Sequence, residues 1–100
     1  MLKKDLLELC LLQLLAGGDK YGYEVLTPLR AAFPDTQESA IYALLRGLGK
    51  AGCSEWYMAA GGGGPDRKYY RITSAGQTRL EEMRDQWRNM RDAIASFGVE

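Results

Sequence analysis

Apolar residues recur at alternating intervals of three and four throughout the last quarter of the chain. The series consists of Leu80, Met83, Trp87, Met90, Ile94 and Phe97. This spacing predicts one long α-helix over residues 74–97, capped by Thr73 or Ser74, with a single continuous apolar seam. Because the preceding segments can already supply a core, we interpret the seam as an interface with a second subunit. The alternative is that the seam closes the core of its own domain.

Three shorter helices are predicted in the first half of the chain, over residues 3–17, 21–33 and 37–51. Gly17 and Gly52 stand at the ends of the first and third segments, where glycine is favoured. Pro28 lies inside the second segment, where it removes a backbone donor and should kink or break the helix. The second and third helices, joined by a short turn, form a helix-turn-helix outline.

The start of the third helix carries its own signal. Asp35 or Thr36 should be the N-cap, because both side chains accept hydrogen bonds from free backbone N–H groups. Asp35 followed by Glu38 has the spacing of a capping box. The expected buried stripe of this helix is Ile41, Leu44, Leu45 and Leu48.

The first helix has two apolar stripes, whereas a surface helix of a monomer needs one. One stripe contains Leu7, Cys10, Leu11 and Leu14, and the other contains Leu2, Leu6, Leu9 and Gln13. We predict that the first stripe packs on its own domain and that the second contacts a partner subunit.

Residues 54–60 and 67–73 are predicted to form a hairpin around the flexible Gly-rich loop 61–66. Arg67, Lys68 and Arg71 give its base a local positive charge, although the net charge of the 100-residue chain is zero. Such a hairpin suits a wing that lies along a phosphate backbone. The alternative is an ordinary solvated charged face.

The amino-acid composition argues against catalysis and against a metal site. The chain has no histidine, and Cys10 and Cys53 are far apart in the sequence. The glycine run at 61–64 lacks the Lys-Ser or Lys-Thr of a phosphate-binding loop. No apolar run reaches the ~18 residues of a membrane span, and no segment has the pattern of a secretion signal. We therefore expect a cytoplasmic domain with reduced thiols and without enzymatic activity, cofactor or metal.

Four motifs follow one another along the chain. They read L-E-L-C-L-L-Q-L-L-A-G-G (7–18), Y-G-Y-E (21–24), S-A-I-Y-A-L-L-R (39–46) and G-G-G-P-D-R-K-Y-Y-R-I-T (62–73), the last followed by Ala75-Gly76. The strand behind the Gly-Pro loop is the most specific of them. In this order the motifs resemble the PadR family of bacterial transcriptional regulators, in particular its short subfamily with one C-terminal helix.

The resemblance implies a homodimer that binds a near-palindromic double-stranded DNA operator, mostly as a repressor. The third helix would enter the major groove, and the hairpin would touch the adjacent backbone or minor groove. Carried onto this chain, it assigns DNA contacts to Gln37, Ser39, Ala40, Tyr42, Arg46, Arg67 and Lys68. Tyr69 and Tyr70 lie on opposite faces of their strand, and we expect Tyr70 to be mainly structural.

Three residues depart from the family pattern. Gly47 and Gly49 stand where charged residues are usual, and Pro28 is unusual in the second helix. Each glycine in a helix interior costs roughly 1 kcal/mol relative to alanine, and a missing charge removes a phosphate contact. A weak repressor, a drifted paralogue and close approach of the backbone to DNA are the alternatives that this leaves.

The resemblance also implies a pocket at the dimer interface, where flat aromatic compounds stack on a central Trp of the last helix. Trp87 matches that position, and the expected effector contacts are Trp87, Met83, Met90, Leu6 and Leu9, with Leu2 as a further wall. The alternative is that Trp87 is only a packed interface residue, and Trp56 is expected in strand packing. The expected dimer interface is Leu2, Leu6, Leu9, Leu80, Met83, Trp87, Met90, Ile94 and Phe97.

Together these observations predict an α+β, mainly helical fold. It consists of a winged helix-turn-helix domain over residues 1–73 and a C-terminal dimerisation helix over residues 74–100, in one compact unit. The predicted function is a homodimeric DNA-binding transcriptional repressor that responds to a small hydrophobic or aromatic effector. The alternative is a winged-helix protein-interaction module with weak or no DNA binding.

Overall fold

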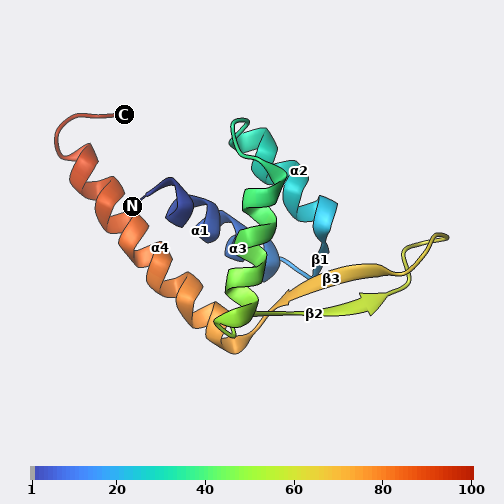
Figure 1. The fold of residues 1–100 in the computed structure, drawn as a ribbon. Helices are drawn as coiled ribbons and strands as arrows, with labels where there is room; N and C mark the ends of the chain where they lie inside the picture. The colour runs from blue at the N-terminus through green and yellow to red at the C-terminus, as the bar shows by residue number, and fades with distance from the viewer. Residues whose placement is uncertain (1) are drawn as a thin grey trace.

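Helices supply most of the regular structure in the computed structural model, which describes residues 2–100 (Figure 1). In chain order the elements are α1 (Lys3–Ala16), β1 (Lys20–Tyr21), α2 (Gly22–Ala32), α3 (Glu38–Lys50), β2 (Ser54–Ala59), β3 (Arg67–Ile72) and α4 (Ser74–Ala95). The expected α+β, mainly helical fold with a helix-turn-helix and a hairpin wing is confirmed.

The core forms where α1, α2 and α3 meet the first half of α4. Its fully buried side chains include Leu11, Leu12, Leu15, Val25, Ile41, Leu48 and Leu80. Full burial of such a side chain contributes about 1.5–3 kcal/mol, so this cluster is the main source of stability. In α1 the buried stripe includes Leu12 and Leu15, whereas Cys10 and Leu14 only pack against its edge. The buried stripe of α1 is therefore rotated about the helix axis relative to the expected stripe, because α1 is covered by both α2 and α4.

The sheet has the order β1-β3-β2, with both pairings antiparallel. β1 was not predicted, because two residues carry no recognisable alternation. The register places Trp56 opposite Tyr70 and Tyr57 opposite Tyr69, so each pair lies on a different face of the sheet. Tyr70 packs against the core, as expected for the structural member of the two tyrosines in β3.

Pro28 does not break α2, which continues through it to Ala32. The proline removes one backbone hydrogen bond at a cost of about 3 kcal/mol. Val25, Leu26 and Leu29 on the same helix are buried, and their combined burial exceeds that cost. The expected break was wrong because tertiary packing outweighs the local penalty.

The N-cap of α3 is Gln37, not Asp35 or Thr36, and its side chain makes no capping hydrogen bond. The expected capping box is therefore absent. The N–H of Thr36 donates to the Phe33 carbonyl (3.0 Å), which closes the preceding turn and places the helix start after Gln37. Glu38 instead accepts a hydrogen bond from Arg30 of α2, at 3.3 Å.

A junction of hydrogen bonds around Thr73 joins the end of α3, the base of the hairpin and the start of α4. The Thr73 hydroxyl donates to the Gly52 carbonyl (2.6 Å) and accepts from the Gly76 N–H (3.1 Å), so Thr73 is the N-cap, as predicted. Its own N–H donates to the Cys53 carbonyl at 3.0 Å. Gly52 adopts φ +76°, a conformation that side chains disfavour.

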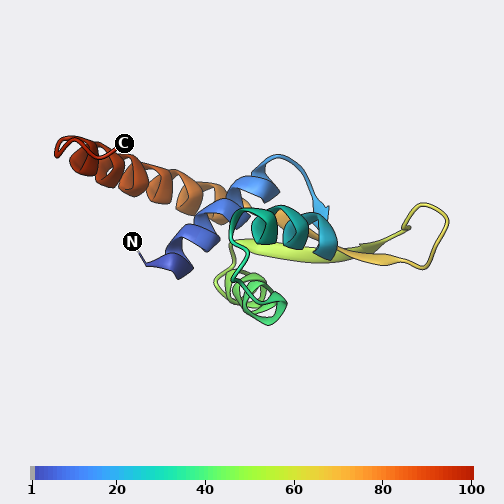
Figure 2. The same cartoon turned by 90° about the horizontal axis from the view of Figure 1, so that it is seen from above.

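The apolar seam of α4 divides into two parts. Leu80 and Met83 are only 1% and 6% exposed within the single chain, because they pack into its own core. From Trp87 onward the seam is exposed, and the helix extends away from the body opposite the hairpin (Figures 1 and 2). Leu80 and Met83 are therefore removed from the expected interface. No helix in residues 2–100, including α4, is long and apolar enough to span a membrane.

Two helix glycines should respond in opposite ways to alanine. A Cβ on Gly76 would collide with the Cys53 carbonyl and lie 2.7 Å from the Ile72 side chain, whereas one on Gly47 would meet nothing within 4 Å. Gly76→Ala should lower the free energy of unfolding by about 1–3 kcal/mol. Gly47→Ala should raise it by about 0.5–1 kcal/mol. Urea titration followed by circular dichroism measures both, and equal effects would contradict the assigned packing of Gly76.

Candidate nucleic-acid interface and apolar groove

The surface of α3 away from the core carries the residues that we expected to contact DNA. Gln37, Ser39, Ala40 and Arg46 are exposed, and Tyr42 is half-buried. Tyr42 and Arg46 turn toward the hairpin, where each lines a hollow shared with Lys68. Gln37 and Ala40 instead border a hollow between α3 and the start of α1. The structure therefore brings part of the expected set together with the wing and leaves part of it at the other side of α3.

A hollow of about 510 Å³ lies between α3 and the hairpin. It is lined by Leu45, Arg46, Gly49, Lys50, Ser54, Glu55, Trp56, Lys68 and Tyr70. Sequence reasoning missed Lys50 and Trp56 as members of this surface. The signal for Trp56 was available, because strand alternation places it on the face of Tyr70 and Lys68.

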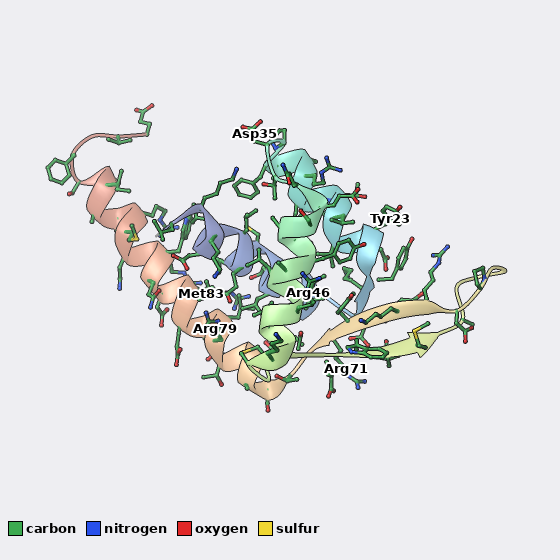
Figure 3. All side chains as sticks on the ribbon, in the orientation of Figure 1. Tyr23, Asp35, Arg46, Arg71, Arg79 and Met83 are labelled. Carbon is green, nitrogen blue, oxygen red and sulfur yellow. The ribbon has the colours of Figure 1, made fainter. Side chains whose placement is uncertain are left out.

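The cations of the expected positive cluster have different surroundings. Arg71 lies 2.9 Å from the carboxylate of Glu55, so its charge is paired on the outer face of the hairpin. Lys68 lies over the ring of Trp56, 4.3 Å from its centre, and Arg67 lies over Tyr21 at 4.4 Å. Cation–π contacts hold these two charges in place without neutralising them. Figure 3 shows Arg46 on α3 and Arg71 on the opposite side of the hairpin.

Three tyrosines on the outer face of the sheet fix the hairpin to the start of α2. Tyr57 stacks on Tyr69, and Tyr69 meets Tyr21 edge-on, each pair with ring centres 5.7 Å apart. The Tyr57 hydroxyl donates to the Asp19 carboxylate at 2.6 Å, and this hydrogen bond raises the pKa of Tyr57. The stack limits how far the wing can swing relative to the helices.

The glycine of Y-G-Y-E has a local reason. A Cβ on Gly22 would lie 2.8 Å from the Tyr42 hydroxyl, so the first turn of α2 needs glycine for Tyr42 to pack beside it. Burial raises the pKa of the neighbouring Tyr70, with a contribution from Tyr42 and an opposing one from Arg46. Tyr42 and Tyr70 both pack against the core and so form a support beneath the exposed face of α3.

A groove of about 600 Å³ lies on the other side of the molecule, between α1, α2 and α4. It is lined by Leu6, Leu9, Cys10, Gln13, Leu14, Pro28, Leu29, Ala32, Phe33, Arg84, Trp87 and Arg88. Of the expected effector contacts, Leu6, Leu9 and Trp87 lie in it. Met90 borders an adjoining hollow that shares Leu6 and Trp87. Met83 lies in the core and not in the groove, so its assignment as an effector contact is wrong for this chain.

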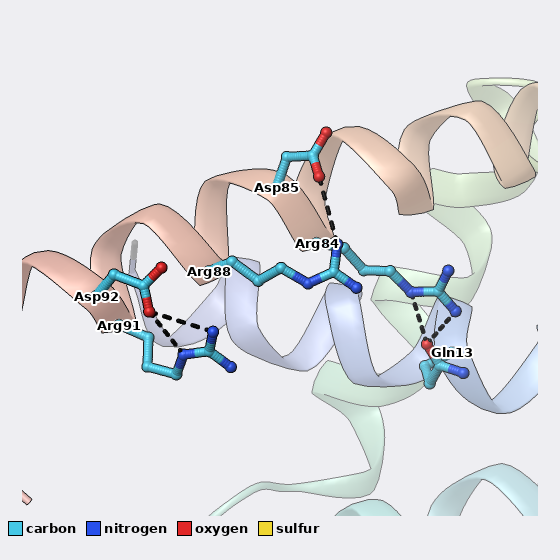
Figure 4. A network of polar contacts seen from close by, with 6 residues as sticks. All are labelled: Gln13, Arg84, Asp85, Arg88, Arg91 and Asp92. Carbon is cyan, nitrogen blue, oxygen red and sulfur yellow. Dashed lines mark hydrogen bonds and ion pairs between the residues drawn. The ribbon is translucent and has the colours of Figure 1, made fainter.

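Arginines stand along the polar side of the groove (Figure 4). The Arg84 guanidinium donates twice to the amide oxygen of Gln13, at 2.6 and 3.0 Å. Because that partner is neutral, the charge of Arg84 remains available to an anion. Arg88 has a longer contact with Asp85, at 3.5 Å. Burial raises the pKa of the Cys10 thiol on the apolar side, which keeps it protonated and non-nucleophilic.

Comparison with known proteins adds independent information. The model of the transcriptional regulator PadR-like family matches residues 11–82. A crystal structure of a PadR-like transcriptional regulator from Bacillus cereus is 34% identical, with a TM-score of 0.88 over 97% of this chain and 95% of that one. A Streptococcus transcriptional regulator is 32% identical, with a TM-score of 0.86 over 96% of this chain and 95% of that one. An uncharacterised protein from Lysinibacillus sphaericus is 32% identical over 91% of this chain and 86% of its own length.

Arg46→Ala should weaken binding to double-stranded DNA and lower the slope of log affinity against log salt by about one, because one phosphate contact is lost. Arg79→Ala is the matched control, since Arg79 is paired with Glu8 of α1 and does not line the hollow that contains Arg46. Fluorescence anisotropy of labelled DNA at several salt concentrations measures both slopes. An unchanged affinity in Arg46→Ala would contradict the assignment of this face.

Proposed function

Because the chain belongs to the PadR-like family of transcriptional regulators, we propose that it acts as a homodimeric repressor that responds to a small hydrophobic or aromatic molecule. Family membership implies a DNA-binding transcriptional regulator. We add to it a dimer, repression and an effector. The observation that carries them is the exposed apolar surface at the end of α4, which continues into the groove beside Trp87.

The dimer proposal is supported by side chains that a monomer would leave in water. Trp87 is 40% exposed and Ile94 48%, both on the seam of α4, and Phe97, just after the helix ends, is 88% exposed. Leu6 of the second apolar stripe lies on the same side, since Leu6 and Trp87 line one groove, and Leu2 of that stripe is exposed. Contiguous exposed apolar residues of this kind mark interaction sites. A twofold interface would cover the same patch on both copies.

Such a dimer gives the two α3 helices a fixed separation. Two α3 helices would then meet successive major grooves, about 34 Å apart, on a near-palindromic site. A repressor of this kind blocks transcription by occupying the operator. In the proposed dimer, contacts at the ends of the two α4 helices therefore determine the separation and orientation of the two DNA-facing α3 helices.

The effector proposal places a planar molecule against Trp87 in the groove. Leu6, Leu9 and Phe33 supply apolar walls, and the Trp ring supplies a flat surface for stacking. Arg84 and Arg88 favour a ligand that also carries an acidic group. A ligand that binds the groove more tightly when the protein is off DNA shifts the population toward the released state.

A second candidate is a winged-helix module that works through protein contacts alone. It is favoured by the zero net charge and by Gly47 and Gly49, which leave two positions in the last turn of α3 without a charged side chain. Gel-shift titration with DNA from the chain's own promoter region, at low salt, separates the two. Retardation supports the regulator, whereas its absence supports the interaction module, because phosphate contacts are strongest at low salt.

Trp87→Asp should raise the dimer dissociation constant by roughly 100-fold, because a carboxylate would replace an apolar contact in the interface. Asn89→Asp is the matched control, because it adds the same charge to an exposed position outside the seam. Sedimentation velocity at a series of concentrations measures the change. Met83→Asp is unsuitable, because Met83 is buried in the core of each chain. A monomeric unsubstituted protein would overturn the dimer proposal.

A planar aromatic acid should quench the emission of Trp87 and release DNA. In Trp56→Phe the only tryptophan is Trp87, and 2-naphthoate serves as the probe with neutral 2-naphthalenemethanol for comparison. We expect the acid to bind about tenfold more tightly, and Arg84→Ala to remove that preference. Binding of 2-naphthoate that persists unchanged in Trp87→Ala would remove this residue from the effector site.

A further inference from the structure

Trp56 is exposed in a place where the fold does not need it. It is 58% exposed on β2, and its neighbour on the same face, Met58, is also exposed. A single exposed apolar residue needs no explanation. Trp56, however, forms one wall of the hollow between α3 and the hairpin, and that hollow also contains Arg46, Lys50 and Lys68.

The cations in this hollow are not neutralised by its acid. Glu55 is the acidic residue in the lining, and its carboxylate is held by Arg71 on the outer face, with a hydrogen bond of 3.0 Å. The Lys68 ammonium is kept beside the hollow by the face of Trp56, at 4.3 Å. The hollow therefore combines a net positive charge with one broad apolar wall.

Gly49 provides a second, independent observation. It lies in the last turn of α3, one residue before the helix ends, and has a helical backbone that does not require glycine. A Cβ there would make only ordinary contacts, 3.9 Å from the Ser54 hydroxyl. The fold itself thus gives no reason for glycine. Gly49 lines the hollow, and the missing side chain keeps that space open.

We propose that this hollow is the seat of one sugar–phosphate strand of DNA, with Trp56 packed against a deoxyribose and Arg46, Lys50 and Lys68 against the flanking phosphates. This inference rests on the proposed DNA-binding function and deepens it. A sugar–phosphate strand alternates apolar rings with negative charges, which matches a lining that alternates Trp56 with cations. Gly49 gives the strand room between helix and wing.

The seat positions the protein and does not read sequence. Its lining contains no Asn or Gln, the side chains that pair with adenine edges, and its Arg and Lys side chains, which could otherwise pair with guanine, are assigned to phosphates in this proposal. Gln37 lies outside it, beside α1. Contacts to the backbone set register and affinity, whereas base contacts set specificity. Loss of the Trp56 side chain should therefore weaken binding to operator DNA and to non-operator DNA by the same factor.

The first test uses the unsubstituted protein labelled with 5-fluorotryptophan. It gives two fluorine resonances, one for Trp56 and one for Trp87, which Trp56→Phe assigns. DNA is added until the anisotropy of labelled DNA shows saturation. At that point the Trp56 resonance should have a changed chemical shift, and this shift should no longer differ between water and heavy water. A Trp56 resonance unchanged at saturation overturns the proposal.

The second test separates the apolar contact from the charges. Trp56→Ala should weaken DNA binding about tenfold with little change in the salt slope, because an apolar contact releases no counterions. Lys68→Ala should lower the slope by about one, and Arg79→Ala should leave it unchanged, because Arg79 is paired with Glu8 and does not line the hollow. Gly49→Leu should raise thermal stability and weaken DNA binding, since it fills the hollow.

The outcomes distinguish this proposal from the one on which it rests. If the unsubstituted protein binds DNA at low salt and Trp56→Ala and Gly49→Leu bind equally well, the seat is wrong and the regulator stands. If the unsubstituted protein binds no DNA, the proposed function and the seat are both overturned. Because Trp56 is largely exposed, Trp56→Ala is expected to fold, and its circular dichroism melt verifies this.

Discussion

The hydrogen bonds of Thr73 fix the relation between the two functional surfaces. Its hydroxyl donates to the turn after α3 and accepts from the first turn of α4, and Thr73 itself directly follows the last residue of β3. The close approach of Gly76 to the Cys53 carbonyl leaves no space for α4 to slide along that turn. A change in the direction of α4 must therefore be shared by the hairpin base and the end of α3. Such a junction would couple the groove beside α4, which we propose as the effector site, to the proposed DNA-binding surface.

The apolar seam of α4 shows that one periodic pattern can include a buried stretch and an exposed stretch of the same helix. Leu80 and Met83 complete the core against α1, and the same spacing continues beyond the point where the domain ends. Periodicity reports which face of a helix is apolar but not what covers it. Core closure, one of the two alternatives left open by the sequence, thus holds for the first stretch of the helix, and the exposed stretch after it is the surface that we propose as an external interface. Only the length of α1 and the place where it crosses α4 decide where the change occurs.

Local patterns predicted the helices, the hairpin and the Thr73 cap, because each depends on residues close together in the sequence. The errors have a different origin. β1 exists because two residues pair with β3 almost fifty positions later, and Pro28 is tolerated because distant side chains bury the same helix. The hollow at Trp56 likewise joins α3 with two strands. Such features depend on tertiary contacts, which propensity and spacing do not contain.

Zero net charge does not argue against DNA binding once the partners of each charge are known. Ion pairs compensate much of the charge away from the hollow: Arg79 pairs with Glu8, Arg30 with Glu38 and Arg71 with Glu55. Within the hollow, the only acid is already engaged by Arg71, so the cations there face solvent without a competing carboxylate. The potential that a phosphate backbone meets depends on this local imbalance, because salt screens charges beyond about 8–10 Å. A chain of this composition can therefore attract DNA at one surface and remain neutral as a whole, with an affinity set by a few phosphate contacts and the apolar wall beside them.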